Sequence, residues 1–152
     1  MAFRVWSTAF DDGGPIPLRH SKEGENVAPA IEWADPPSGT RSYVLLCEDP
    51  DAPSGVFTHW MIWDIPGTTT EIPEGFLPGA IGVAGTNDFG DEGYGGPLPP
   101  TGHGPHRYIF KVYAMDTKRI PLHHGAHRNE FERAMWGHII EETSVMGKYE
   151  RG

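Results

Sequence analysis

The sequence contains almost no cysteine and no long apolar run. Cys47 is the single cysteine among 152 residues, so no disulfide can form within the chain. It ends the apolar run Tyr43–Cys47, where a thiol acts as a small buried hydrophobic group. No stretch reaches the ~20 apolar residues of a membrane-spanning helix, and the first residues lack the apolar segment of a signal peptide. We therefore expect a protein of the reducing cytoplasm with no integral membrane association.

Basic residues are also scarce. The chain has 12 Lys and Arg residues against 21 Asp and Glu residues, which gives a net charge of −9. An acidic protein is repelled by nucleic acids and by anionic membrane surfaces, so neither is an expected partner. A pocket for a small anion stays compatible with this charge, because such a pocket depends on a few local donors.

The residues that are present predict one mainly β domain spanning residues 1–152. Apolar residues make up 38% of the chain, and Gly and Pro punctuate them as turns. Runs rich in Val, Ile and aromatic residues predict strands. These runs are Phe3–Thr8, Ile16–His20, Tyr43–Cys47, Trp60–Ile65 and Tyr108–Met115, with a weak one at Ala80–Ala84. Val27–Trp33 is predicted to be extended, and its Pro29 favours an edge strand or a covering arm.

One helix is predicted near the end of the chain. A mostly apolar stripe with helical spacing runs from Phe131 to Glu142, and acidic residues near its start suit the positive end of a helix dipole. Gly147 ends the pattern, and Tyr149 begins a last short strand. The expected fold is two β-sheets packed face to face with one C-terminal helix. The Gly- and Pro-rich segment 72–92 has no readable periodicity, which favours a functional or closely packed irregular segment.

Polar residues at the strand ends are the candidates for chemistry. Asp49 and Asp51 follow one strand, His59 begins the next, and His106 begins a third after a Gly-rich loop. Taken singly, an Asx-type turn, a buried core histidine and an ordinary hairpin loop explain them equally well. Taken together, these residues suit several chemistries, one of which is an anion pocket with two imidazole donors beside an Asp. In such a pocket the carboxylate would raise the imidazole pKa values and keep both rings charged.

Two other functions use the same residues. A metal-assisted or acid–base hydrolase would use Asp49, His59 and His106, with His103 as a further nominal metal ligand. No Gly-x-Ser-x-Gly motif supplies a nucleophile. An interaction module with an unused pocket is the third hypothesis. The group His123, His124 and His127 and the acidic run 88–92 are predicted to be solvated surface loops, and the acidic run lacks EF-hand spacing.

Two long motifs carry a resemblance to a known family. The first is Asp49-Pro50-Asp51-Ala52-Pro53 followed by His59-Trp60, and the second is the loop and strand start from Gly95 to Tyr108. Together they resemble the phosphatidylethanolamine-binding protein family, also called Raf kinase inhibitor-like proteins, in its short bacterial and archaeal form. The resemblance implies a two-sheet Greek-key β-sandwich with a small anion pocket at one end.

The resemblance also implies which residues form the pocket and what the pocket binds. Carried over by position, Asp49, His59, Pro100, His106 and Tyr108 line it, with Asp51 and Gly96 beside it. The implied function is non-enzymatic binding of phosphorylated small molecules, phospholipid head groups or phosphorylated side chains, without a metal or cofactor. An inhibitory role toward a protein kinase or a protease, and a homodimer, are further implications.

Overall fold

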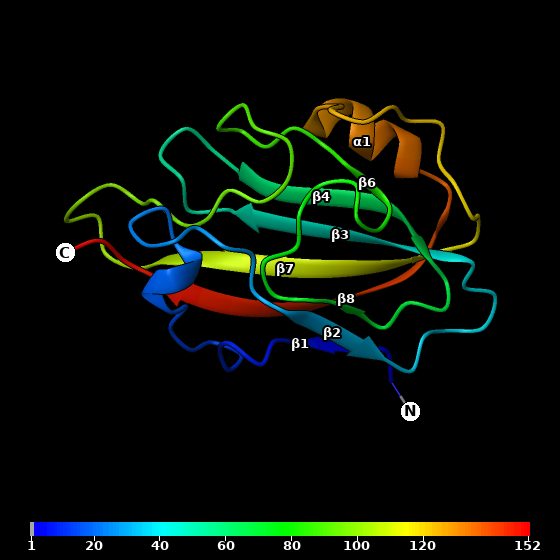
Figure 1. The fold of residues 1–152 in the computed structure, drawn as a ribbon, viewed down its shortest axis with the longest axis horizontal. Helices are drawn as coiled ribbons and strands as arrows, with labels where there is room; N and C mark the ends of the chain where they lie inside the picture. The colour runs from blue at the N-terminus through cyan, green and yellow to red at the C-terminus, as the bar shows by residue number, and fades with distance from the viewer. Residues whose placement is uncertain (1) are drawn as a thin grey trace.

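The computed structural model describes residues 2–152, and strands dominate them (Figure 1). In chain order the elements are β1 (Arg4–Trp6), the 3₁₀ helix η1 (Leu18–His20), β2 (Ile31–Ala34), β3 (Ser42–Asp49), β4 (Phe57–Pro66), β5 (Glu71–Ile72), β6 (Val83–Ala84), β7 (His106–Met115), α1 (Arg128–Met135) and β8 (Ile139–Tyr149). The strands form two sheets, of order β1-β2-β5 and β6-β4-β3-β7-β8. A mainly β fold with two sheets and one α-helix confirms the predicted fold class.

Strand β3 is the centre of the larger sheet. It pairs antiparallel with β4 on one side and with β7 on the other, so Cys47 lies opposite both Trp60 and Phe110. Strand β8 extends the sheet beyond β7, in antiparallel pairing along almost its full length. Because β3 pairs on both edges, its backbone polar groups face partners on two strands, with irregular pairing to β4 between Tyr43 and Leu45 and between Cys47 and Glu48.

The larger sheet is buried on both faces. Successive side chains of a strand point to opposite faces, so Leu45 packs toward the small sheet and Leu46 packs toward the helix. The core between the sheets includes Ile31 and Trp33 of β2. The core on the other face includes Phe131 of α1. Burial on both faces explains why β3 reads as an unbroken apolar run rather than an alternating one.

Two predicted strands near the N-terminus differ from the structure. The segment Ile16–His20 does not form a strand, because its last three residues form η1 after Pro17 fixes an extended backbone. The predicted edge strand at Val27–Trp33 is wrong in position and in kind. Strand β2 begins at Ile31, beyond Pro29, and pairs with β1 on one edge and β5 on the other. The proline therefore precedes the hydrogen-bonded ladder and does not interrupt it.

The predicted helix is too long at its C-terminal end. Helix α1 stops at Met135, and Gly137 follows with a φ of +86° that an L side chain rarely adopts. The chain then turns into β8, whose first residue, Ile139, pairs with Met115. Residues 139–142 fit the helical spacing of the sequence, but backbone pairing with β7 decides their conformation.

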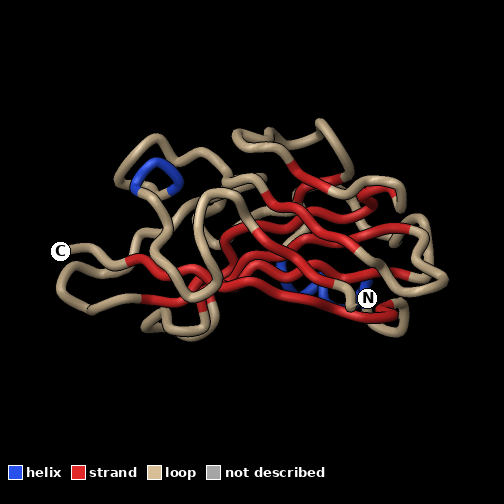
Figure 2. The backbone as a smooth tube through the Cα atoms, turned by 90° about the horizontal axis from the view of Figure 1, so that it is seen from below, coloured by secondary structure: helices blue, strands red, loops and turns tan. Residues whose placement is uncertain are grey.

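Three strand ends meet at one end of the larger sheet. Because β3 is antiparallel to both neighbours, its last residue, Asp49, lies beside the first residues of β4 and β7. Long loops gather at this end, where the C-terminus also lies (Figures 1 and 2). No helix in residues 2–152 has the length and apolar character needed to cross a membrane.

Candidate functional site

A cavity of about 430 Å³ opens where these strand ends meet. Its wall comes from the ends of β3, β4 and β7 and from three loops. The lining residues are Asp49, Ala52, Pro53, Ser54, Gly55, Val56, Phe57, His59, Asp88, Phe89, Leu98, Pro99, Pro100, His106 and Tyr108. Five of the seven predicted site residues are in this wall, and Asp51 and Gly96 lie outside it. Their role in binding a ligand stays a prediction.

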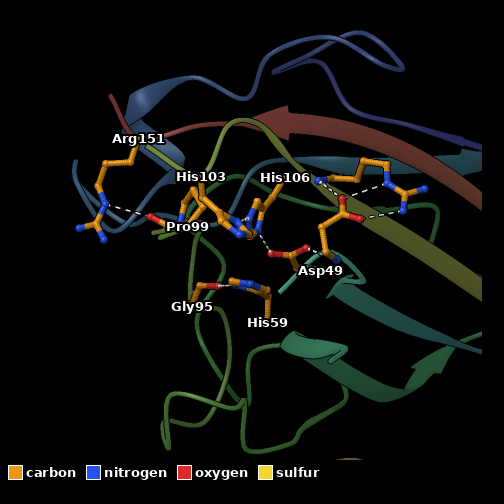
Figure 3. A network of polar contacts seen from close by, with 9 residues as sticks. Asp49, His59, Gly95, Pro99, His103, His106 and Arg151 are labelled. Atoms are coloured by element: carbon orange, nitrogen blue, oxygen red, sulfur yellow. Dashed lines mark hydrogen bonds and ion pairs between the residues drawn. The ribbon is translucent and has the colours of Figure 1, made fainter. Parts of the chain in front are cut away.

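Asp49, His106 and His103 form a chain of three polar side chains (Figure 3), of which the first two line the cavity. His106 Nδ1 lies 2.7 Å from Asp49 Oδ2, and both side chains are buried. A buried carboxylate accepts, so the Nδ1 atom of His106 carries the proton. The other ring nitrogen, Nε2, lies 2.6 Å from Nδ1 of His103. The second Asp49 oxygen accepts from the backbone N–H of Asp51 at 2.7 Å, which fixes the carboxylate.

His59 is held differently from His106. Its Nδ1 lies 2.6 Å from the carbonyl oxygen of Gly95, and a carbonyl only accepts, so Nδ1 carries the proton. Burial lowers the pKa of His59 below the usual 6.5, against the opposing influence of the Gly95 carbonyl and Asp49. Asp49 does raise this pKa, as expected, but the expectation that it keeps the ring charged is wrong, because desolvation of the ring outweighs the carboxylate. In its neutral form His59 presents Nε2 as an acceptor.

The Tyr108 hydroxyl is buried and has no hydrogen-bond partner within the described residues. Burial, and then the negative charge of Asp49, raise the pKa of Tyr108, so the hydroxyl keeps its proton. The ring packs edge-on against His59 at 5.1 Å between centroids. A buried donor without an acceptor is costly. Tyr108 lines the cavity next to Asp49, so its hydroxyl is a candidate donor to a ligand there.

Asp51 lies outside the cavity and links two segments beside it. Its carboxylate accepts three hydrogen bonds from Arg107: from the backbone N–H at 2.9 Å, from Nε at 3.0 Å and from one terminal nitrogen at 2.8 Å. These bonds lower the pKa of Asp51 to about 2. The pair joins the loop after β3 to the start of β7, next to His106.

Gly96 is required by packing. A Cβ atom at this position would lie 2.2 Å from the His20 carbonyl oxygen and 2.9 Å from Asn26 Oδ1. The same Asn26 oxygen accepts from the Gly96 backbone N–H at 2.8 Å. This close approach positions Gly95, whose carbonyl holds His59.

We expect Gly96→Ala to destabilise the protein by about 1–3 kcal/mol, the usual effect of overpacking, and to disturb His59. Urea unfolding measures the first effect, and the imidazole NMR signals of His59 measure the second. Gly152→Ala adds the same methyl group where nothing lies within 4 Å, so it serves as the control. Wild-type stability in Gly96→Ala would show that the neighbouring backbone yields without cost.

Six wall residues belong to neither sequence motif: Ser54, Gly55, Val56, Phe57, Asp88 and Phe89. The last two lie in the irregular segment 72–92, within the acidic run that was predicted to be a solvated loop. Asp88 Oδ2 accepts from the Thr58 backbone N–H at 2.7 Å, which ties this irregular segment to the start of β4. The aromatic rings of Phe57 and Phe89 are 4.7 Å apart and flank His59.

The wall contains two carboxylates, from Asp49 and Asp88, and no Lys or Arg. Positive charge within the wall itself therefore depends on protonated imidazoles, and Lys22 Nζ lies just beyond it, 3.8 Å from the centroid of the Phe89 ring. The nominal metal set of the hydrolase hypothesis does not form a site: within residues 2–152 no three His, Cys, Asp or Glu side chains are grouped to hold a metal ion. Cys47 is buried in the centre of β3, as predicted.

The other polar clusters lie elsewhere, as predicted. His123, His124 and His127 are exposed, and His124 pairs with Glu92 at 2.7 Å. The acidic run is mostly exposed, apart from the contribution of Asp88 to the cavity.

Comparison with known proteins identifies the family. The sequence profile of the phosphatidylethanolamine-binding proteins matches residues 6–150. The chain belongs to the phosphatidylethanolamine-binding protein family. A UPF0098 protein of Aquifex aeolicus is 46% identical over 150 residues, which cover 97% of this chain and 88% of that protein.

Two solved members of the phosphatidylethanolamine-binding protein family share the fold. CT736 of Chlamydia trachomatis, described as a homologue in this family, has a TM-score of 0.90 at 34% identity and covers 99% of both chains. YbcL of Escherichia coli, described as a new member of the mammalian family, has a TM-score of 0.93 at 32% identity over the full length of both. The family assignment made from the two sequence motifs is confirmed.

Proposed function

We propose that this phosphatidylethanolamine-binding protein family member binds phosphate-type anions in the cavity and does so without catalysis. The observation that carries the proposal is the Tyr108 hydroxyl, a buried donor on the cavity wall without a protein partner. An oxygen of a bound anion supplies the missing acceptor. Nε2 of His106 is the second donor when the ring is protonated, since its other nitrogen already donates to Asp49.

The charge of the wall selects the protonation state of the ligand. Two carboxylates and no Lys or Arg repel a dianion, so binding requires protons. A phosphoryl group can bring one, because its second pKa is near 6. The acceptor Nε2 of His59 can receive a proton from such a group or take one up from solvent. Binding is therefore coupled to proton uptake.

The ligand class is a phosphate monoester with an apolar or small organic part. The exposed side chains of Val56 and Leu98 stand at the cavity beside the ring of Phe57, where they can contact the remainder of such a molecule. Phosphorylated small molecules, phospholipid head groups and phosphorylated side chains share this chemistry. The name of the family points to the same class. Inhibition of a kinase or protease, and a homodimer, are further proposals that rest on the family resemblance.

Calorimetric titration with sulfate and with phosphate between roughly pH 5.5 and 8.5 tests the proposal. Sulfate keeps its charge over this range, so its pH dependence reports the protein alone. Imidazolium donors are lost as pH rises through their pKa values, and burial lowers the pKa of His59 below that of an ordinary imidazole. We expect the sulfate affinity to fall with rising pH, by about tenfold or more over the range.

A flat sulfate profile would contradict anion binding by the histidines. No heat with phosphate, phosphorylethanolamine or a phosphopeptide at any pH in the range would overturn the proposal as a whole. Turnover of a phosphoester substrate would replace it with the hydrolase hypothesis.

A further inference from the structure

His103 occupies the one atom of His106 that an anion needs. The Nδ1 atom of His106 is committed to Asp49, so Nε2 is the remaining ring nitrogen. In the structure this atom lies 2.6 Å from Nδ1 of His103, and the two rings are 4.8 Å apart at 63° (Figure 3). His103 is not part of the cavity wall; it reaches His106 from the exposed loop outside.

The contact holds a single proton. Two ring nitrogens 2.6 Å apart can share one hydrogen, given by either ring, whereas two facing N–H groups would repel each other. An anion is an acceptor, so it binds His106 only when Nε2 carries that proton. The lone pair of His103 and the anion then compete for the same N–H group.

The loop that carries His103 is built to release it. Gly102 and Gly104 flank the histidine at φ values of +75° and +80°, and a Cβ at either position would meet no atom within 4 Å. Two hydrogen bonds to Arg151 hold the loop: the Gly102 N–H donates to the Arg151 carbonyl at 3.2 Å, and Arg151 Nε donates to the Pro99 carbonyl at 2.9 Å. The His103 N–H also donates to the Pro100 carbonyl at 3.2 Å within the loop. Pro99 is buried and anchors the start of the loop, whereas residues 100–103 are exposed, so only these few hydrogen bonds hold the tip that carries His103.

We infer that His103 is a latch that closes the anion site by capping Nε2 of His106, and that a bound phosphate displaces it. This inference rests on the proposed function and names its regulation. The ligand must replace an existing hydrogen bond, so the closed site has a lower affinity than an open one. Arg151 affects how readily His103 is displaced, because its hydrogen bonds hold the loop that carries His103.

Phosphate titration of four variants of the full chain tests the latch. His103→Ala removes the competing nitrogen, and we expect phosphate to bind about threefold to tenfold more tightly, as for loss of one competing hydrogen bond. Arg151→Ala removes the Nε bond to Pro99, keeps the backbone bond to Gly102 and keeps the His103 imidazole, so its affinity should lie between those of wild type and His103→Ala. His138→Ala removes an exposed histidine paired with Asp116 beyond the other end of β7, and should bind as wild type does. His106→Ala, which removes the capped atom, should not bind.

The imidazole NMR signals of His103 give a second readout. In wild type they should move on addition of phosphate toward those of a free exposed histidine. Weaker phosphate binding by His103→Ala would show that His103 is a donor to the anion and would overturn the latch. Unchanged affinity in His103→Ala would overturn it too.

If the proposed function itself is wrong, the four variants give a different pattern of results. If neither wild type, His103→Ala nor Arg151→Ala binds phosphate, both the anion site and its latch are overturned. If His103→Ala binds and wild type does not, the latch is supported in its strongest form.

Discussion

Replacement of His106 by alanine should abolish phosphate binding at accessible concentrations. The variant loses a donor that is charged when protonated, and such hydrogen bonds contribute about 1.5–3 kcal/mol, or roughly 10- to 150-fold in affinity. It also leaves Asp49, which is 3% exposed, without its histidine partner. Removing one member of a buried pair destabilises proteins by about 3–5 kcal/mol. Calorimetry and urea unfolding measure the two effects.

A second substitution separates binding from folding. In His106→Asn the side-chain amide can still donate to Asp49, but nothing replaces Nε2, so binding should be lost with a smaller loss of stability. His138→Ala is the matched control, because its partner, Asp116, is half exposed and such pairs contribute little. Phosphate binding by His106→Ala with wild-type affinity would place the anion elsewhere.

Replacement of Phe131 by alanine should cost about 3–5 kcal/mol of stability. This ring is fully buried between α1 and the larger sheet, and it packs against Trp63 at 5.8 Å between centroids. Its removal leaves a cavity under the only α-helix in the described residues. Chemical denaturation measures the loss.

Trp136, one residue beyond the helix, provides the control. It is 82% exposed, so Trp136→Ala should change the stability by less than about 0.5 kcal/mol in spite of the larger side chain removed. Phosphate affinity should stay unchanged in both variants wherever the protein is folded, because α1 lies on the face of the sheet and contributes no residue to the cavity wall. Equal losses in the two variants would mean that Phe131 is not anchored in the core.

Strands buried on both faces were the part of the fold that the sequence predicted best. The runs at Tyr43–Cys47, Trp60–Ile65 and Tyr108–Met115 lie within β3, β4 and β7, because such strands need unbroken apolar residues. Strand β8 was not predicted at its true length, since its first residues are exposed and carry no alternating pattern. Only the pairing with β7 holds them in a strand, and pairing between distant segments leaves no local signal.

For the candidate site too, residues at strand ends were predicted from the sequence, whereas a residue of an irregular segment was not. Asp49, His59 and His106 stood at predicted strand ends, and antiparallel pairing brings those ends together. Asp88 belongs to the acidic run in the irregular segment, which was predicted to be a solvated loop, and nothing in the sequence placed it beside β4. The protonation of His59 was predicted wrongly, because a sequence shows the nearby carboxylate but does not show how deeply the ring is buried.

The buried thiol of Cys47 can serve as a chemical probe for opening of the larger sheet. The thiol is 1% exposed in the middle strand of the larger sheet, and burial raises its pKa well above the ordinary value, so alkylating reagents react with it only after β3 opens. The rate of labelling therefore reports how often the whole sheet opens. A bound anion stabilises only the folded protein, so it should slow the labelling of Cys47 in proportion to the occupancy of the anion site. This effect can be measured even when the ligand itself gives no spectroscopic signal.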